Sequence, residues 1–118
     1  VYPNVILTGS MEPGIMPGDA VIVKRLTEEE DIYRLAVGDV INFNRDNINI
    51  THRIIKIDED RAGNRQFITK GDNNKSEDVQ PVMPNDINGT VIKVIPKIGI
   101  PVILLKGNND IPDDVVDK

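Results

Sequence analysis

Cysteine is absent from this chain of 118 residues. Its absence excludes disulfide bonds, thiolate nucleophiles and sulfur-ligated metal sites, and it leaves the redox compartment open. Aromatic residues make up only 3% of the sequence, and tryptophan does not occur. The hydrophobic core is therefore expected to consist mainly of Val, Ile and Leu.

Long apolar segments and an excess of basic residues are also absent. Lys and Arg number 14 against 19 Asp and Glu, and this net charge of −5 argues against a nucleic-acid partner. The longest apolar segment, Ile98–Leu105, contains Pro101 and is far shorter than the roughly 18 residues that span a bilayer. Because the first residue is Val1 and not methionine, we expect a processed chain or a piece of a longer protein.

The residues that are present indicate one globular domain rich in β-structure. The composition is 39% hydrophobic and 28% charged, which is typical of an ordered domain. Short β-branched segments alternate with Gly, Pro, Asn and Asp, and such spacing predicts a mainly-β, antiparallel fold. We expect a β-sandwich or a partly closed barrel with one short helix. The segments predicted as strands are Val5–Leu7, Ala20–Lys24, Val40–Phe43, Ile48–Ile57, Gln66–Thr69 and Val91–Ile95.

The single helix is predicted over Glu28–Leu35. Thr27 is expected as its N-cap, with Glu30 as the return partner of a capping box. The acidic residues of the first turn complement the helix dipole, and the expected role of this helix is structural.

The C-terminal region is expected to differ from the rest of the chain. Gly107–Lys118 is rich in Asn and Asp and is predicted to be a solvated acidic tail. The apolar segment Ile98–Leu105, just before it, has two interpretations. It is either a buried final strand or an apolar edge that rests on a lipid interface or leads into a membrane segment.

Ser10 is the first candidate for chemistry. It follows a short predicted strand in the segment Thr8-Gly9-Ser10-Met11-Glu12-Pro13 and precedes a turn rich in Pro and Gly. A serine held on such a turn can present its hydroxyl as a nucleophile and its own N–H to a substrate oxyanion. The alternative interpretation is an ordinary turn serine.

His52 is the only histidine of the chain. If the protein is a serine hydrolase that uses an imidazole, this residue is the only available base. The alternative is a buried or solvated histidine with no chemical role. A metal site is not indicated, because His52 has no further histidine and no HExxH-like spacing around it.

The segment Gly71–Asp78 follows a predicted strand and contains two aspartates, Asp72 and Asp78, six positions apart. It is interpreted as a solvated turn, as a weak calcium loop, or as the source of the acid that orients a catalytic histidine. The calcium interpretation is poor because the acidic spacing and the closing glutamate of an EF-hand are missing. The residues alone leave open which aspartate contacts the histidine.

Together, in this order along the chain, these segments resemble the catalytic domain of type I signal peptidases. They keep the order of that family and extend over most of the chain. The segments that carry the resemblance are Gly9-Ser10-Met11-Glu12-Pro13 with Met16-Pro17-Gly18-Asp19, Val37-Gly38-Asp39-Val40-Ile41, Thr51-His52-Arg53-Ile54, and Thr69-Lys70-Gly71-Asp72-Asn73-Asn74 through Asp78.

One position indicates the branch of the family. The usual bacterial enzymes have a lysine as general base immediately before an arginine, whereas here His52 precedes Arg53. A histidine at this position is typical of the branch found in the endoplasmic reticulum, in archaea and in some Gram-positive spore formers. A Ser–Lys dyad is therefore disfavoured, since the nearest lysine, Lys56, would have to replace His52.

The resemblance implies a role for each matching residue. Ser10 would be the nucleophile, and His52 would be the general base that later protonates the leaving amine. Asp78 matches the acid of the triad, and Asp72 matches a second, supporting acidic position. Thr8 stands where the bacterial enzymes often have a serine that helps to form the oxyanion hole, and the N–H of Ser10 would be the other donor.

The resemblance also implies an activity. Residues 1–106 would form the catalytic domain of a serine endopeptidase that removes N-terminal signal peptides after small residues, in an Ala-x-Ala-like pattern. The signal peptide would bind as an extended strand to an exposed sheet edge, and no cofactor or metal is expected.

The family is anchored by a membrane segment that precedes the serine motif. Since Ser10 lies close to Val1, we expect this chain to be a soluble fragment without that anchor. In the full-length protein the catalytic domain would be on the extracytoplasmic face. Membrane lipid would be contacted through the anchor, and Ile98–Leu105 is a second candidate for such a contact.

Two alternatives belong to other classes of protein. A repressor-type, self-cleaving protease would need a Ser–Lys dyad and an Ala-Gly cleavage site, but Ala62-Gly63 lies beyond the proposed base. A catalytically silent accessory or scaffold domain of the same fold stays open, because motifs indicate a capacity for chemistry and not turnover.

Overall fold

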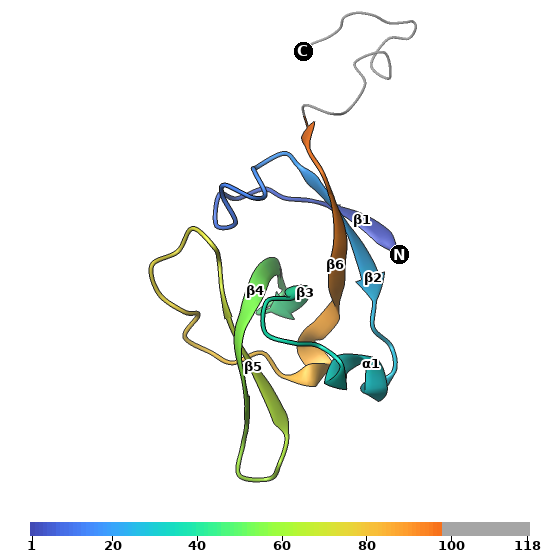
Figure 1. Cartoon of the computed structure of the whole chain (residues 1–118), viewed down its shortest axis with the longest axis vertical. Coiled ribbons are helices and arrows are strands. Elements are labelled where there is room, and N and C mark those ends of the chain that lie inside the picture. The colour runs from blue at the N-terminus through green and yellow to red at the C-terminus, as the bar shows by residue number, and fades with distance from the viewer. Residues whose placement is uncertain (98–118) are drawn as a thin grey trace, which may run out of the picture.

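The computed structural model describes residues 1–97, and these residues form a mainly antiparallel β-fold (Figure 1). The predicted apolar segment Ile98–Leu105 and the predicted tail from Gly107 onward lie outside the described residues. The strands are β1 (Tyr2–Val5), β2 (Ala20–Arg25), β3 (Val40–Arg45), β4 (Ile48–Glu59), β5 (Arg65–Lys70) and β6 (Ile87–Ile95). The helices are α1 (Glu29–Tyr33) and the 3-10 turn η1 (Pro84–Asp86).

All the strands belong to one six-stranded sheet with the order β1-β2-β6-β3-β4-β5. Every neighbouring pair is antiparallel, so the predicted fold class is confirmed. The sheet is open, with β1 and β5 as its outer strands, and it corresponds to a partly open barrel-like sheet more than to a two-sheet sandwich. In Figure 1 the β4–β5 hairpin extends away from the β1–β2 end of the molecule.

Two hydrophobic clusters pack against this sheet. The first lies around Phe43 and Phe67, which are both fully buried and are the only phenylalanines of the chain. The second lies around Met11, which enters it from the connection between β1 and β2. Apart from these three residues, the buried members are Ile, Val and Leu, as the scarcity of aromatic residues predicts.

The two elements near the start of the chain differ from the prediction. Strand β1 begins at Tyr2 and ends at Val5, because it pairs with Ala20–Val23 of β2. The helix is shorter than predicted, and the expected Thr27 cap is wrong: Glu28 is the N-cap, without a side-chain hydrogen bond. Acidic residues in the first turn still complement the helix dipole.

Asn42 is a fully buried polar residue in the centre of the sheet. Its amide nitrogen donates to Asn49 Oδ1 at 2.8 Å and to Thr51 Oγ1 at 3.0 Å, both on β4. Its carbonyl oxygen accepts from the Tyr2 hydroxyl at 3.0 Å and from Asn88 Nδ2 at 2.9 Å. These bonds satisfy the buried amide and connect β1, β4 and β6 to β3. They therefore hold β1 and β4 at a defined distance from each other.

Among residues 1–97, no helix is long and apolar enough to cross a membrane.

Gly89 of β6 lies where the neighbouring strand β2 packs closely against it. It pairs with Arg25 of β2 and with Asn42 of β3, and a register shift of the β3–β6 ladder lies next to it, between Asn42 and Phe43. A Cβ atom at this position would collide with the Lys24 carbonyl oxygen and would lie 2.7 Å from Val23 Cγ1. Only glycine allows the strands to pack at this distance.

We therefore expect Gly89→Ala to lower the free energy of unfolding by about 1–3 kcal/mol, since the clash involves backbone and a buried valine. Gly14→Ala is the matched control, because the nearest atom to its added Cβ would be the Met11 carbonyl oxygen at 3.9 Å. Denaturant unfolding of both variants checks the prediction, and equal stability of the two would contradict it.

Candidate active site

The segment that carries Ser10 connects β1 to β2 and is fixed by its neighbours. Met11 is 1% exposed and packs in the second core cluster with Ile15. Backbone bonds from Glu12 N to Gly9 O at 3.2 Å and from Ile15 N to Met11 O at 3.0 Å close the turn. Because the residue after the serine is buried, the backbone at Ser10 has a defined position at the surface of the domain.

The buried carboxylate of Asp19 lies at the end of the connection between β1 and β2. Asp19 Oδ2 accepts a hydrogen bond from Met16 N at 2.8 Å, and Oδ1 accepts one from Lys97 N at 2.9 Å. The N–H groups of Lys97 and Met16 hold the pKa of Asp19 below its ordinary value of 3.8. The carboxylate therefore stays ionised and ties the start of β2 to the end of the described chain.

His52 lies on β4, opposite Ile41 of β3, and is 9% exposed. The ring of Phe43 meets the imidazole in an edge-on arrangement, with centroids 6.3 Å apart and an interplanar angle of 72°. This contact with a core side chain restricts the orientation of the imidazole.

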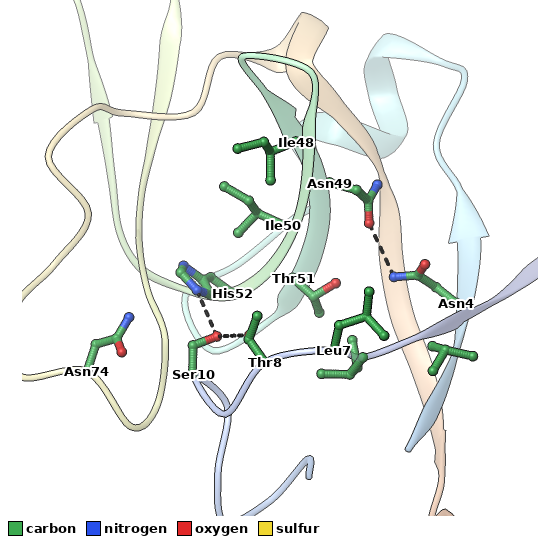
Figure 2. A pocket seen from close by; sticks show the side chains of 12 residues that line it. Asn4, Leu7, Thr8, Ser10, Ile48, Asn49, Ile50, Thr51, His52 and Asn74 are labelled. Carbon is green, nitrogen blue, oxygen red and sulfur yellow. Dashed lines mark hydrogen bonds between the residues drawn. The ribbon is translucent and has the colours of Figure 1, made fainter. Parts of the chain in front are cut away.

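The structure brings Ser10, His52 and Asp78 together. His52 Nε2 lies 3.2 Å from Ser10 Oγ, and His52 Nδ1 lies 2.7 Å from Asp78 Oδ2. Thr8 Oγ1 lies 3.2 Å from Ser10 Oγ, so both hydroxyls and the imidazole form one cluster (Figure 2). Within residues 1–97 the N–H of Ser10 donates no hydrogen bond, and this group is free to meet a substrate oxygen.

Asp72, the other acidic candidate, lies apart from this cluster. Its two oxygens accept hydrogen bonds of 2.9 Å from Arg53 Nε and Nη2, and Arg53 Nη1 donates to Gly38 O at 2.7 Å. The guanidinium lowers the pKa of Asp72, and the carboxylate raises the pKa of Arg53. The choice between the two aspartates, which the sequence left open, is therefore resolved in geometry: Asp78 contacts the histidine.

The loop Gly71–Asp78, called the acidic loop here, also binds the backbone at Gly9 and Ser10. This contact was not predicted from the sequence. Asn73 N donates to Ser10 O at 2.8 Å, and Asn73 Nδ2 donates to Gly9 O at 3.2 Å. A Cβ atom on Gly71 would lie 2.7 Å from Ser10 O and 3.0 Å from Ser10 Cβ. Gly71, which precedes Asp72 and two asparagines, was a possible signal of a close backbone approach.

A groove with a volume of about 550 Å³ begins at Ser10 and His52. One wall is the chain from Asn4 to Thr8, and the other is the start of β4, from Ile48 to Thr51 (Figure 2). At its far end Asn4 Nδ2 donates to Asn49 Oδ1 at 3.2 Å, while Asn74 lies on the other side of the serine.

The start of β4 has one edge without a strand neighbour. Strand β3 pairs with β4 from Ile48 to Arg53, but β5 pairs with β4 only from Arg53 onward. Within residues 1–97, the segment before Arg53 therefore presents backbone groups of one edge to the groove. An extended peptide could add to this edge as a strand.

Other arrangements considered from the sequence are not supported by these contacts. Lys56 Nζ lies 3.7 Å from Asp58 Oδ2 and is exposed, so the nearest lysine is not the partner of Ser10. Both aspartates of the segment considered as a calcium loop already have partners, since Asp72 pairs with Arg53 and Asp78 with His52. Among residues 1–97, no group of three or more His, Asp or Glu side chains could hold a metal ion.

The ion pair between Arg53 and Asp72 predicts a pH-dependent effect on stability. The folded-state pKa of Asp72 lies below 3.8, so the pair stabilises the folded state above that pH and the contribution is lost as the pH falls through the lowered pKa. We expect Asp72→Asn to cost roughly 1 kcal/mol near pH 7, and we expect the difference from wild type to shrink between about pH 4 and about pH 2.

Thermal unfolding across this pH range measures the effect. Glu77→Gln, an exposed change in the same loop, is the control and should follow the wild type throughout. A deficit of Asp72→Asn that is the same at all pH values would contradict the prediction.

No protein-family model matches the chain. Curated proteins do match it. The signal peptidase complex catalytic subunit SEC11 of Eremothecium gossypii is 37% identical over 114 residues, covering 88% of this chain and 65% of that protein. Signal peptidase I W of Bacillus subtilis is 41% identical over 83 residues, covering 70% of this chain and 42% of that protein.

The human signal peptidase complex catalytic subunit SEC11C is 31% identical over 117 residues, covering 92% of this chain and 57% of that protein. The chain thus spans 42% to 65% of the length of these three relatives. They come from fungi, bacteria and mammals, and the similarity extends over most of this chain in each comparison. The resemblance that the motifs predicted is confirmed: this chain belongs to the type I signal peptidase family, in the branch that includes SEC11 and signal peptidase I W.

Proposed function

We propose that the full-length protein is a serine endopeptidase that removes signal peptides from secretory precursors. The single observation that carries the proposal is the position of His52, with hydrogen bonds of 3.2 Å to Ser10 and 2.7 Å to Asp78. This arrangement is that of a Ser-His-Asp triad, in which the histidine serves as general base for the serine nucleophile. The similar proteins are named as signal peptidases or as catalytic subunits of a signal peptidase complex.

In the first half of the reaction, Ser10 Oγ attacks the carbonyl carbon of the scissile bond. His52 Nε2 takes the hydroxyl proton as the C–O bond forms. The same nitrogen then gives that proton to the leaving amine as the C–N bond breaks, and an acyl ester remains on Ser10. Asp78 accepts the Nδ1–H of His52 throughout and stabilises the imidazolium.

In the second half, a water molecule replaces the leaving amine. His52 Nε2 takes a proton from the water as its oxygen attacks the ester carbon. The proton returns to Ser10 Oγ as the ester bond breaks, so the free serine and a carboxylic acid are formed, and the acid then loses its proton to solvent as a carboxylate. No residue changes its oxidation state, and no cofactor enters either half.

The oxyanion formed in each half needs two hydrogen-bond donors. We assign the Ser10 N–H and the Thr8 hydroxyl to this role, because the first is free within residues 1–97 and the second is adjacent to Ser10 Oγ. Thr8 must turn its proton from Ser10 toward the substrate oxygen as charge develops there.

The groove favours an extended substrate that adds to the free edge of β4. In an extended chain every second side chain points to the same face, so the first and third residues before the cut would enter the groove. The distance along β4 from His52 to the Asn4–Asn49 bridge is about 10 Å, at roughly 3.3 Å per residue. A groove of this length holds about three residues of an extended chain, which matches the span of the proposed Ala-x-Ala-like pattern.

We further propose that residues 1–106 form the catalytic domain and that it acts at the extracytoplasmic surface of a membrane. The relatives are named as signal peptidases, and secretory signal peptides direct their precursors across a membrane. The apolar side chains of Leu7 and Val5, which are 84% and 55% exposed, lie on the wall of the groove and would face the same surface as the substrate.

The proposal predicts that Ser10→Ala and His52→Ala each reduce the cleavage of a secretory precursor by the full-length, membrane-anchored protein by about 10⁴-fold or more. His52→Lys should not restore the full rate, because nothing in the site is arranged to hold a neutral amine at that position. The measurement is the rate of conversion of precursor to mature protein.

Ser76→Ala is the matched control, since Ser76 is the only other serine and is exposed in the loop before Asp78. It should cleave at the wild-type rate. Near-normal cleavage by His52→Ala would disprove the imidazole mechanism, and a wild-type protein without cleavage would favour the scaffold alternative.

A further inference from the structure

We propose that Thr69 is a positioning residue for the catalytic triad, acting through the carboxylate of Asp78. This inference rests on the proposed function and adds to it a residue that touches neither the substrate nor the serine. Thr69 lies near the end of β5 and is fully buried. It does not line the groove that begins at Ser10.

The contact that carries the proposal is short and specific. Thr69 Oγ1 donates a hydrogen bond of 2.7 Å to Asp78 Oδ2. This oxygen is the same one that accepts the Nδ1–H of His52, also at 2.7 Å. An ionised carboxylate offers only acceptors, so the hydroxyl beside it must be the donor. Both bonds are charge-assisted, which makes them stronger than bonds between neutral groups.

Thr69 holds Asp78 through its backbone as well. Asp78 N donates to Thr69 O at 2.8 Å. One residue of β5 therefore fixes both the main chain and the side chain of the triad acid. Two attachments to one strand residue prevent the carboxylate from rotating away from the histidine.

The attachment connects the triad to the hydrophobic core. Phe67, two residues earlier on β5, exchanges backbone bonds of 2.9 Å and 2.8 Å with Val82, and both side chains are fully buried. The chain from Asp78 to Val82 therefore runs beside β5 in antiparallel alignment. The packing of Val82 and the hydroxyl of Thr69 together set the position of Asp78.

The hydrogen bond from Thr69 fixes the Asp78 carboxylate in a loop that is otherwise exposed. Residues 72 to 77 of the loop are exposed. Asp78 is therefore held by its hydrogen bonds to Thr69 of β5 and not by packing of its chain neighbours. When His52 takes the proton of Ser10, the imidazolium needs the carboxylate oxygen in line with Nδ1. The Thr69 hydroxyl keeps Oδ2 in that line before charge develops.

The test compares Thr69→Val with Thr69→Ser in the full-length protein. Valine keeps the shape of threonine without the donor, and we expect kcat to fall about 10- to 100-fold with KM nearly unchanged. Serine keeps the hydroxyl and should restore most of kcat. If Thr69→Val does not fold, Thr69→Ala takes its place in the same comparison.

The matched control is Thr90→Val. Thr90 lies on β6, and its Oγ1 donates a part-buried hydrogen bond of 3.1 Å to Val40 O of β3. This bond does not involve a residue of the triad. Its loss should lower stability and leave kcat unchanged. A second readout uses the single histidine of the chain, whose ring-proton NMR signals are free of overlap from other histidines. The downfield Nδ1–H signal should shift or broaden in Thr69→Val and return in Thr69→Ser.

In a double-mutant cycle, Thr69→Val should cause no further loss of kcat once Asp78→Ala is present. A Thr69→Val variant that keeps both the wild-type kcat and the wild-type Nδ1–H signal would overturn the proposal, as would a kcat deficit that serine does not restore. These outcomes leave the proposed function intact. That function fails separately, if Ser10→Ala retains cleavage.

Discussion

The hydrogen bond between His52 Nδ1 and Asp78 Oδ2 is the contact on which the rest of the site depends. Because an ionised carboxylate only accepts, this bond places the ring proton on Nδ1 and leaves the lone pair of Nε2 toward Ser10. The imidazole is buried and its edge faces Phe43, so neither ring nitrogen can exchange its partner for another side chain without a change in packing. In the neutral imidazole, Nε2 therefore carries the lone pair that proton abstraction from Ser10 requires.

The three residues of this cluster come from separate parts of the chain, and their alignment depends on contacts between loops. The acidic loop donates through Asn73 to the carbonyl of Ser10, and Gly71 allows the two backbones to approach closely. Arg53, the residue after His52, binds Asp72 of the same loop. Each segment therefore supports the other two, and a shift of the acidic loop would move the serine and the histidine together.

The sheet sets the width of the groove beside Ser10 and leaves one edge of β4 free there. The bonds of Asn42 connect β1 to β3 and β4, and so set the distance between the two walls of the groove. Strand β5 leaves β4 unpaired before Arg53, so a free strand edge lies beside the serine. An extended substrate, as proposed, would pair with this edge and place its scissile carbonyl near Ser10.

The sequence by itself determined the mainly-β fold class, the candidate nucleophile Ser10, the only available imidazole and the family, because composition, periodicity and motif order are local properties. Only the tertiary structure decided that Asp78 and not Asp72 contacts His52, that Glu28 and not Thr27 begins the helix, and that Thr69 and Asn73 support the site. The hydrogen bonds of His52 join residues 42 and 26 positions apart. Strand register, bulges and loop packing set such contacts, and no local pattern encodes them.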